Sequence, residues 1–473
     1  MRDLIVSLIV MGALPVSYRR PLVGLLMFSL LAYMRLQDLA WGFARYQRWS
    51  YYVALVTFAG FLSSRRKNPI IIEARSVIMM CLAAFLGVGL IFAHGEAEIN
   101  IAAYLEFCKI VAIALFTTSV IQTRDHLRCM VWVIAMSLGF YGVKNGLAGV
   151  ITLGGAKILQ GPGGMMKDNN DFALAMVMAV PVLFHLYTSE RRQILRQGAL
   201  VMIPLTIVTV MLTHSRGAAL SLAFALSILV WRSRNRFIGI AVGACLIMAA
   251  AAFAPKTYVK RLETIQNFEE DGSAQGRLAA WRVAGRMVRA NPIFGVGLSR
   301  FQVAYLDFEP APSDQQLAGK GGTRVAHNSY FQIWAEGGTP ALLMYLSLLG
   351  LSFFDIWRIR WRARRKYHAS WILSYCSMFE ASLGAFFLGS AFLNRAHFDL
   401  FYHYVAIILV FGTLARKEMD QLDSLVPNPA ESAGRRGRAG RGLRLVQTNG
   451  FRRSAKTART FRRTPLPSRP TRT

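Results

Sequence analysis

The chain of 473 residues is 54% hydrophobic and only 17% charged, a balance too apolar for an ordinary soluble enzyme. Its formal net charge of +30 would suit a nucleic-acid-binding protein. However, 12 Arg and one Lys lie after residue 434, in a segment with too few large apolar residues to fold. The composition therefore favours a membrane protein that binds membrane lipids, with no specific nucleic-acid partner.

The apolar residues are gathered in blocks of helix-spanning length, and about 20 residues cross the hydrocarbon core as a helix. Their continuous runs lack the alternation of β-barrel strands. We therefore predict an all-α fold, a polytopic transmembrane helical bundle of 11–13 spans. The blocks are Leu4–Val16, Pro21–Met34, Tyr52–Leu62, Val77–Ala93, Ile101–Ile121, Met130–Val143, Phe172–Leu186, Ala199–Leu212, Ala218–Trp231, Phe237–Phe253, Pro340–Phe354, Trp371–Leu393 and His403–Leu414.

Arg and Lys gather in every second segment between these blocks. Placing these basic segments and the C-terminal tail in the cytoplasm satisfies the positive-inside rule. The outward segments are then Arg35–Ser50, His94–Asn100, Lys144–Asn170, His214–Gly217, Ala254–His327 and Asn394–Phe398.

The outward segment Ala254–His327 is much the longest, and loops of this length are usually functional. We expect it to contain short helices, among them an amphipathic helix over Ala279–Ala290 that ends before Asn291-Pro292. We predict three parts of the chain. Residues 1–194 form N-terminal transmembrane helices, 195–415 a core that includes the long loop 254–327, and 416–473 a disordered basic cytoplasmic tail.

Three ionisable residues stand out because they lie beside the membrane on the predicted outer face. Arg216 follows His214-Ser215 between two apolar blocks, where a charge is costly unless it is paired or ligand-bound. Arg277 is expected to open a helix, where a guanidinium and free backbone donors could hold a phosphate. His327 ends the long loop and is suited to proton transfer near neutral pH. The alternatives are that Arg216 extends its charge to the lipid headgroups, that Arg277 is a solvated residue on a helix surface, and that His327 has a structural role.

Together these residues fit an anionic, lipid-linked donor. Arg216 and Arg277 would hold a diphosphate, and His327 would take a proton from an attacking hydroxyl. The scheme needs no cofactor and no metal, and the sequence contains none of the common metal-binding or phosphate-loop motifs. The five cysteines lie in or beside apolar blocks, without the spacing of a zinc site.

The sequence resembles the O-antigen ligase and polymerase superfamily over roughly residues 195–355. The similar motifs, in order, are Ser-Arg-Gly-Ala at 215–218, Gly276-Arg277 with Trp281, Asn291-Pro-x-x-Gly-x-Gly297, and His327-Asn328 followed by Glu336-x-Gly338. Segments 39–44, 161–170 and 398–402 resemble the O-glycosylation ligases associated with exosortase systems in Gram-negative bacteria. Lys167 departs from the subgroup pattern Ala-Asp-Asn-Asn.

The resemblance implies an enzyme, a glycosyltransferase of the ligase type. It would transfer a glycan from an undecaprenyl-diphosphate carrier at the periplasmic face of the inner membrane, by metal-independent inverting chemistry. The acceptor would be a glycan, a lipid or a protein. The family's phosphate-binding arginines correspond to Arg216 and Arg277, and its essential histidine to His327.

Five further residues are candidates for an acceptor-binding or structural role. Asn169, Asn170 and Asp171 belong to the subgroup motif, although capping of the following helix is the simpler explanation for Asp171. Glu336 belongs to the superfamily motif, and Asp399 lies at another outward helix edge.

Two alternatives remain open, besides a third in which the chain is a scaffold for an envelope assembly with the long outward loop as its docking surface. The first is a polymerase of the same superfamily, which would extend one lipid-linked glycan with another. The second is a multi-span solute transporter, which should place ionisable groups near the midplane of the membrane. Lys109 is the candidate for such a group, but Glu106 lies one helical turn away and is expected to neutralise it.

Overall fold

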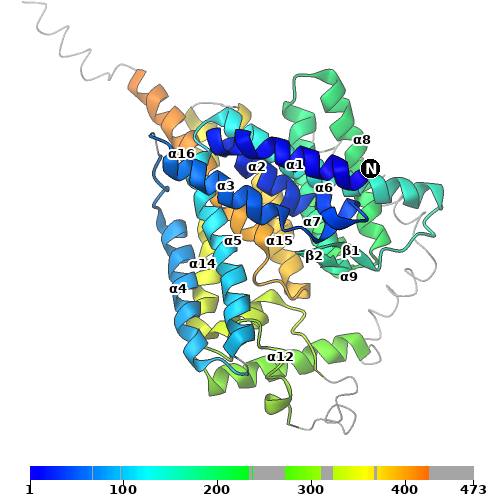
Figure 1. The fold of residues 1–473 in the computed structure, drawn as a ribbon, viewed down its shortest axis with the longest axis vertical. Coiled ribbons are helices and arrows are strands. Elements are labelled where there is room, and N and C mark those ends of the chain that lie inside the picture. Colours follow the sequence, from blue (N-terminus) through cyan, green and yellow to red (C-terminus); the bar gives the residue numbers. More distant parts are fainter. Residues whose placement is uncertain are drawn as a thin grey trace, which may run out of the picture. The chain divides into compact units, whose positions relative to one another are not determined.

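The structure is a computed structural model that describes residues 1–65, 68–95, 97–233, 237, 272–310, 323–366 and 370–425. It confirms the predicted all-α bundle (Figure 1). Residues 1–419 form one compact unit, and of the second unit only residues 420–425 are described. The helices are α1 (Arg2–Arg19), α2 (Pro21–Tyr33), α3 (Trp49–Ser63), α4 (Ala74–Gly89), α5 (Ala97–Val120), α6 (Arg124–Ile151), α7 (Asn169–Ser189), α8 (Gln193–Leu212), α9 (Arg216–Arg232), α12 (Gly272–Ala290), α14 (Ser329–Lys366), α15 (Ser370–Gly389) and α16 (Asp399–Leu425).

Among the described residues, eight helices are long and apolar enough to cross a membrane, and two shorter apolar helices are α2 and α3. The chain is therefore a multi-pass membrane protein, as predicted. The expected span Phe237–Phe253 lies outside the described residues apart from its first residue, and so does the basic tail from 426 onward. In α5, Lys109 forms an ion pair with Glu106, as the spacing predicted.

A two-stranded hairpin is a small exception to the all-helical expectation. Strand β1 (Gln160–Gly163) pairs antiparallel with β2 (Met166–Asp168). The turn uses Gly163 and Gly164, whose φ angles of +109° and +54° suit residues without a side chain. The hairpin leads directly into α7, so it determines where that helix begins.

Helix α7 lies at the centre of the bundle and packs against α6, α8, α9 and α15. Its side chains are buried almost without interruption from Asp171 to Leu183. An apolar surface on every side is expected for a helix that is surrounded by other helices. Packing against these four helices therefore fixes the position of α7 and of its N-terminus.

Helix α12 is longer than the predicted Ala279–Ala290 and begins at Gly272. It lies across the ends of α4, α5 and α14 (Figure 1). Its buried residues repeat at helical spacing and face Phe301 and Tyr305, which confirms the amphipathic pattern. These residues are Ala280, Val283, Ala284 and Met287.

Helix α14 is interrupted at Gly338, which has a φ of +72°. The segment after α12 fills the interruption: the backbone N–H of Val296 donates to the carbonyl of Ala335 at 2.8 Å, and that of Gly297 donates to the carbonyl of Glu336 at 3.0 Å. A Cβ atom on Gly338 would lie 2.1 Å from the carbonyl oxygen of Ile293. Gly295 and Gly338 thus let the two backbones approach closely.

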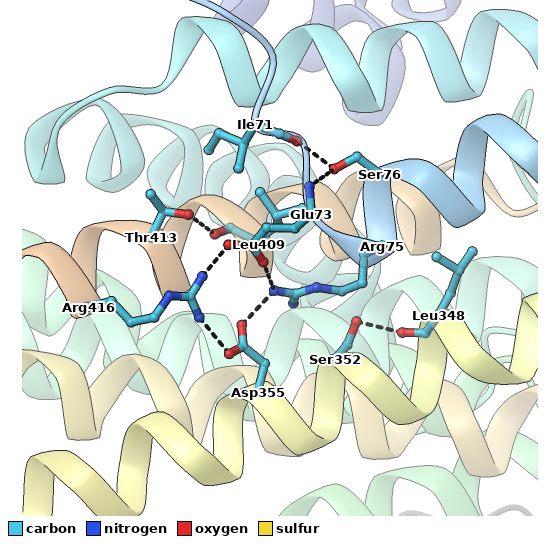
Figure 2. A network of polar contacts seen from close by, with 10 residues as sticks. All are labelled: Ile71, Glu73, Arg75, Ser76, Leu348, Ser352, Asp355, Leu409, Thr413 and Arg416. Atoms are coloured by element: carbon cyan, nitrogen blue, oxygen red, sulfur yellow. Dashed lines mark hydrogen bonds and ion pairs between the residues drawn. The ribbon is translucent and has the colours of Figure 1, made fainter.

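A cluster of ion pairs around the buried Arg75 joins α4, α14 and α16 (Figure 2). The Arg75 guanidinium, 3% exposed, lies 2.5 Å from Asp355 and 3.2 Å from Glu73, and Arg416 contacts the same two carboxylates at 2.7 and 2.5 Å. Two acids and two bases balance one another, as buried charges require. In α14 the cluster lies beyond the interruption at Gly338, on the part of the helix that leads away from Ser329.

Candidate active site

The candidate site lies where the N-termini of α7, α9 and α14 come together with the segment before α16. Each of the first three helices begins with a capping side chain: Asp168 accepts from the Asn170 N–H, Ser215 from Ala218, and Asn328 from Tyr330 and Phe331. Because helix N-termini carry partial positive charge and free N–H groups, this end of the bundle favours an anionic ligand.

Arg216 is the first residue of α9 and is partly buried. The turn before it includes His214, whose φ is +55°. The side-chain amide of Asn169 donates to the Thr213 carbonyl at 3.1 Å, which ties the start of α7 to this turn. Arg216 therefore lies at the end of the bundle, as predicted.

Arg277 does not open a helix, contrary to the sequence-based expectation. Since α12 begins at Gly272, Arg277 lies in the second turn, beyond the free N–H groups of the first. Its position depends instead on Trp281, one turn later. The indole N–H of Trp281 donates to the Ala326 carbonyl at 2.9 Å, and its ring stacks on Phe331 with centroids 5.2 Å apart.

His327 lies between Ala326, which Trp281 holds, and Asn328, which caps α14. Its φ of +46° is unusual for a residue with a side chain, and the residue is exposed. Partial desolvation of the ring and the positive charge of Arg277 lower the pKa of His327 from its ordinary value, while the charge of Asp168 opposes them. The neutral imidazole, which can accept a proton, is thereby favoured at neutral pH.

Asp171 does not cap α7, which corrects the simpler explanation suggested by the sequence. Asp168 is the capping residue, and Asp171 forms an ion pair with Arg395 at 2.5 Å. The Asp171 carboxylate is 5% exposed and the Arg395 side chain 33% exposed. Asn170 contacts Asp168 through its side-chain amide at 3.0 Å. The motif Asp168–Asp171 thus links the start of α7 to the segment before α16.

Asp399 is the first residue of α16, and its charge acts on Arg395. Burial lowers the pKa of Arg395, whereas the ion pair with Asp171 raises it. The net effect is an increase in the pKa of Arg395. Arg395 therefore stays charged, with Asp168 and Asp399 adding to the stabilisation by Asp171. The negative charge of Asp168 acts on both His327 and Arg395.

Glu336 is buried inside α14, with 2% of its side chain exposed. It accepts hydrogen bonds from the Phe301 N–H at 3.3 Å and from the Gln332 amide, and it lies 3.2 Å from Nε2 of His397. These residues line a polar cavity of about 230 Å³. The lining residues are Ser299, Phe301, Gln302, Val325, Gln332, Glu336, Asn394, Arg395 and His397.

Asp168, Arg395 and His397 were not among the site residues predicted from the sequence. All three lie in predicted outward segments, and charges at the membrane edge could have drawn attention to them. Their partners could not be inferred, because Asp171 and Glu336 are distant from Arg395 and His397 in the chain.

Two family models match consecutive parts of the chain. Residues 199–346 match the family described as O-Antigen ligase. Residues 1–191 match a family of unknown function (DUF5935). A search of curated proteins found no match. The O-Antigen ligase segment includes Arg216, Arg277, His327 and Glu336, whereas Asp168, Asn169, Asn170, Asp171 and Asp399 lie outside it.

Proposed function

The chain belongs to the O-antigen ligase superfamily, and from this premise we propose that it transfers a glycan from an undecaprenyl-diphosphate carrier to an acceptor hydroxyl. The proposed acceptor is a glycan, a lipid or a protein. The observation that carries the proposal is the hydrogen bond from the Trp281 indole to the Ala326 carbonyl, because it ties the helix that carries Arg277 to the residue before His327.

In this proposal Arg216 and Arg277 bind the diphosphate, and nearby helix N-termini add partial positive charge. His327, neutral at physiological pH because its pKa is lowered, takes the proton of the acceptor hydroxyl. The hydroxyl oxygen attacks the anomeric carbon as the bond from that carbon to the phosphate oxygen breaks. Undecaprenyl diphosphate leaves, and the anomeric configuration is inverted. The arginines stabilise charge on the leaving group, and no metal takes part.

We propose that the site faces the periplasm and that the chain lies in a bacterial inner membrane. The basic ends of several helices support this orientation. Arg232 and Arg360 share Glu380 at 2.7 and 2.9 Å, and Arg128 contacts Glu190 at 2.5 Å. Arg232 is the last residue of α9 and Arg360 lies in the last two turns of α14, and both helices start at the candidate site, so these arginines lie at the opposite ends of the two helices. The tail would then be cytoplasmic. The division of the chain into three parts at residues 194 and 415 stays a prediction. The association of this protein with an exosortase system also stays a prediction.

A polymerase of the same superfamily would use the same donor chemistry and differ in its acceptor. A transporter is less well supported. Lys109 and Glu106 form their own ion pair on an exposed surface, and the interruption of α14 at Gly338 is filled by the segment around Val296.

The proposal is tested by mass analysis of glycans and their carriers in a strain lacking this chain and complemented with variants. Arg216→Ala, Arg277→Ala and His327→Ala should each accumulate lipid-linked donor while the protein stays in the membrane. Arg289→Ala, an exposed arginine on α12, and His126→Gln are matched controls that should restore the wild-type pattern. An unchanged donor pool with altered solute uptake would support a transporter instead.

A further inference from the structure

The turn between α8 and α9 determines where the Arg216 side chain leaves the backbone. His214 in this turn has a φ of +55°, and Ser215 caps α9 with its side chain. On the other side of Arg216, α9 packs closely against the residues after α15. A Cβ atom on Gly217 would lie 2.7 Å from Cβ of Phe392. The position of Arg216 therefore depends on the contacts that hold this turn.

Two hydrogen bonds from the first part of the chain hold the end of α8. The last four carbonyl groups of a helix have no partner within it, so they need partners from elsewhere. The Ile158 N–H donates to the Leu212 carbonyl at 3.0 Å, and the side-chain amide of Asn169 donates to the Thr213 carbonyl at 3.1 Å. Because Thr213 is fully buried, loss of the Asn169 side chain would leave its carbonyl unsatisfied.

The side chain of Asn169 does not cap its own helix. Asp168 caps α7, and its Oδ1 accepts from the Asn170 N–H at 2.8 Å. The side-chain amide of Asn170 donates to the same Asp168 oxygen and to Oδ1 of Asn169, each at 3.0 Å. The oxygen of the Asn169 amide is thereby directed to Asn170, and its nitrogen is left to donate to Thr213. These three residues form a chain of hydrogen bonds that ends on the turn before Arg216.

We infer that Asn169 is a positioning residue for Arg216, with its amide oriented by Asp168 and Asn170. Groups that bind a reacting ligand must be held to within about 0.5 Å, and they depend on supporting hydrogen bonds for this precision. Asn169 lies in the part matched to the family of unknown function, and Arg216 in the part matched to the O-Antigen ligase family. The first part thereby completes the diphosphate site of the second. The inference rests on the proposed binding of a diphosphate by Arg216.

The test is a double-mutant cycle on the full-length protein in phosphatidylcholine nanodiscs. Isothermal titration calorimetry measures the affinity for inorganic pyrophosphate, and thermal unfolding shows that each variant is folded. Asn169→Ala should weaken binding about fivefold, and Arg216→Ala at least about tenfold. In the Arg216→Ala background, Asn169→Ala should have no further effect, because the residue that it positions is absent. Asn145→Ala, at a half-buried amide on α6, is the matched control and should bind as the wild type does.

Two results would overturn the inference and leave the proposed function intact. One is wild-type affinity in Asn169→Ala when Arg216→Ala is weakened. The other is an equal loss from Asn169→Ala in both backgrounds, since the contact would then act on the fold and not through Arg216.

Failure of the proposed donor site gives a different pattern. If the wild type does not bind pyrophosphate, or if Arg216→Ala binds it normally, the diphosphate role of Arg216 is wrong and the inference fails with it. If Asn169→Ala does not fold, Asn169→Leu enters the same cycle, because it keeps the branched shape of the amide without its donor. Wild-type affinity in that variant would likewise overturn the inference.

Discussion

The indole N–H of Trp281 on α12 donates to the carbonyl of Ala326, 2.9 Å away. Because His327 follows Ala326 directly, this bond fixes the proposed base relative to the helix that carries Arg277. It also explains why a site can form from α12, a helix that lies across the bundle, and α14, which runs along it (Figure 1).

Trp281→Phe removes this hydrogen bond and keeps an aromatic ring against Phe331. We expect a loss of about 1 kcal/mol in unfolding free energy from the unmade bond. We also expect a roughly tenfold slower glycan transfer, because Arg277 and His327 are no longer held in a fixed position relative to each other. Thermal unfolding and a transfer assay on purified protein measure the two effects. Trp357→Phe, at a side chain that is 56% exposed, is the control. Equal transfer rates in the two variants would contradict the positioning role.

The pH dependence of transfer should follow the pKa of His327. As a base, His327 is active when neutral, so transfer falls as the pH drops through that pKa, which lies below the ordinary value of 6.5. Arg277→Gln removes a positive charge that lowers the pKa, so the acid limb of its residual activity should move to higher pH. Asp168→Asn removes a charge that raises the pKa and should move the limb to lower pH, while Asn still caps α7. Shifts in the same direction in both variants would exclude His327 as the titrating base.

The ion pair between Asp171 and Arg395 distinguishes a structural from an acceptor-binding role for Asp171. Asp171→Leu leaves Arg395 without its partner. The cost should be roughly 2–3 kcal/mol, less than for a fully buried pair because Arg395 is a third exposed. The double variant Asp171→Leu/Arg395→Met should recover much of this stability. A double-mutant cycle on thermal unfolding in detergent measures the coupling, and additive single effects would show that the pair does not stabilise the fold.

Gly338 is expected to be intolerant of any side chain. Gly338→Ala combines a φ of +72° with a Cβ 2.1 Å from the Ile293 carbonyl, so the segment that fills the break in α14 must move. We expect a loss of several kcal/mol, on the order of a severe core substitution, and reduced amounts of folded protein. Gly350→Ala in the same helix has open space around it and should be neutral or slightly stabilising. Fluorescence size-exclusion chromatography compares the two, and equal profiles would contradict the close-approach argument.

Local patterns predicted the fold well. The apolar blocks marked the helices, the charge spacing marked the pair Lys109–Glu106, and the apolar spacing in residues 279–290 marked the buried face of α12. The start of α12 was not predicted, because residues 272–276 are small or polar and contain no apolar residues at helical spacing.

The site was predicted only in part. Arg216 and His327 lie at the bundle end as expected, but Arg277 lies within its helix rather than at its start. Asp171 was expected to cap a helix and instead pairs with Arg395, and Glu336 pairs with His397. These are contacts between segments that are far apart in the sequence, and spacing along one chain cannot determine them.

We propose that this membrane protein is a glycan ligase with His327 as its base. The most direct measurement follows undecaprenyl diphosphate released from a purified undecaprenyl-diphosphate-linked glycan by the reconstituted full-length protein, with EDTA present. We expect release that requires acceptor, that persists in EDTA, and that falls by at least roughly 100-fold in His327→Ala while His126→Gln retains it. Wild-type rates in His327→Ala, or release abolished by EDTA, would contradict the account.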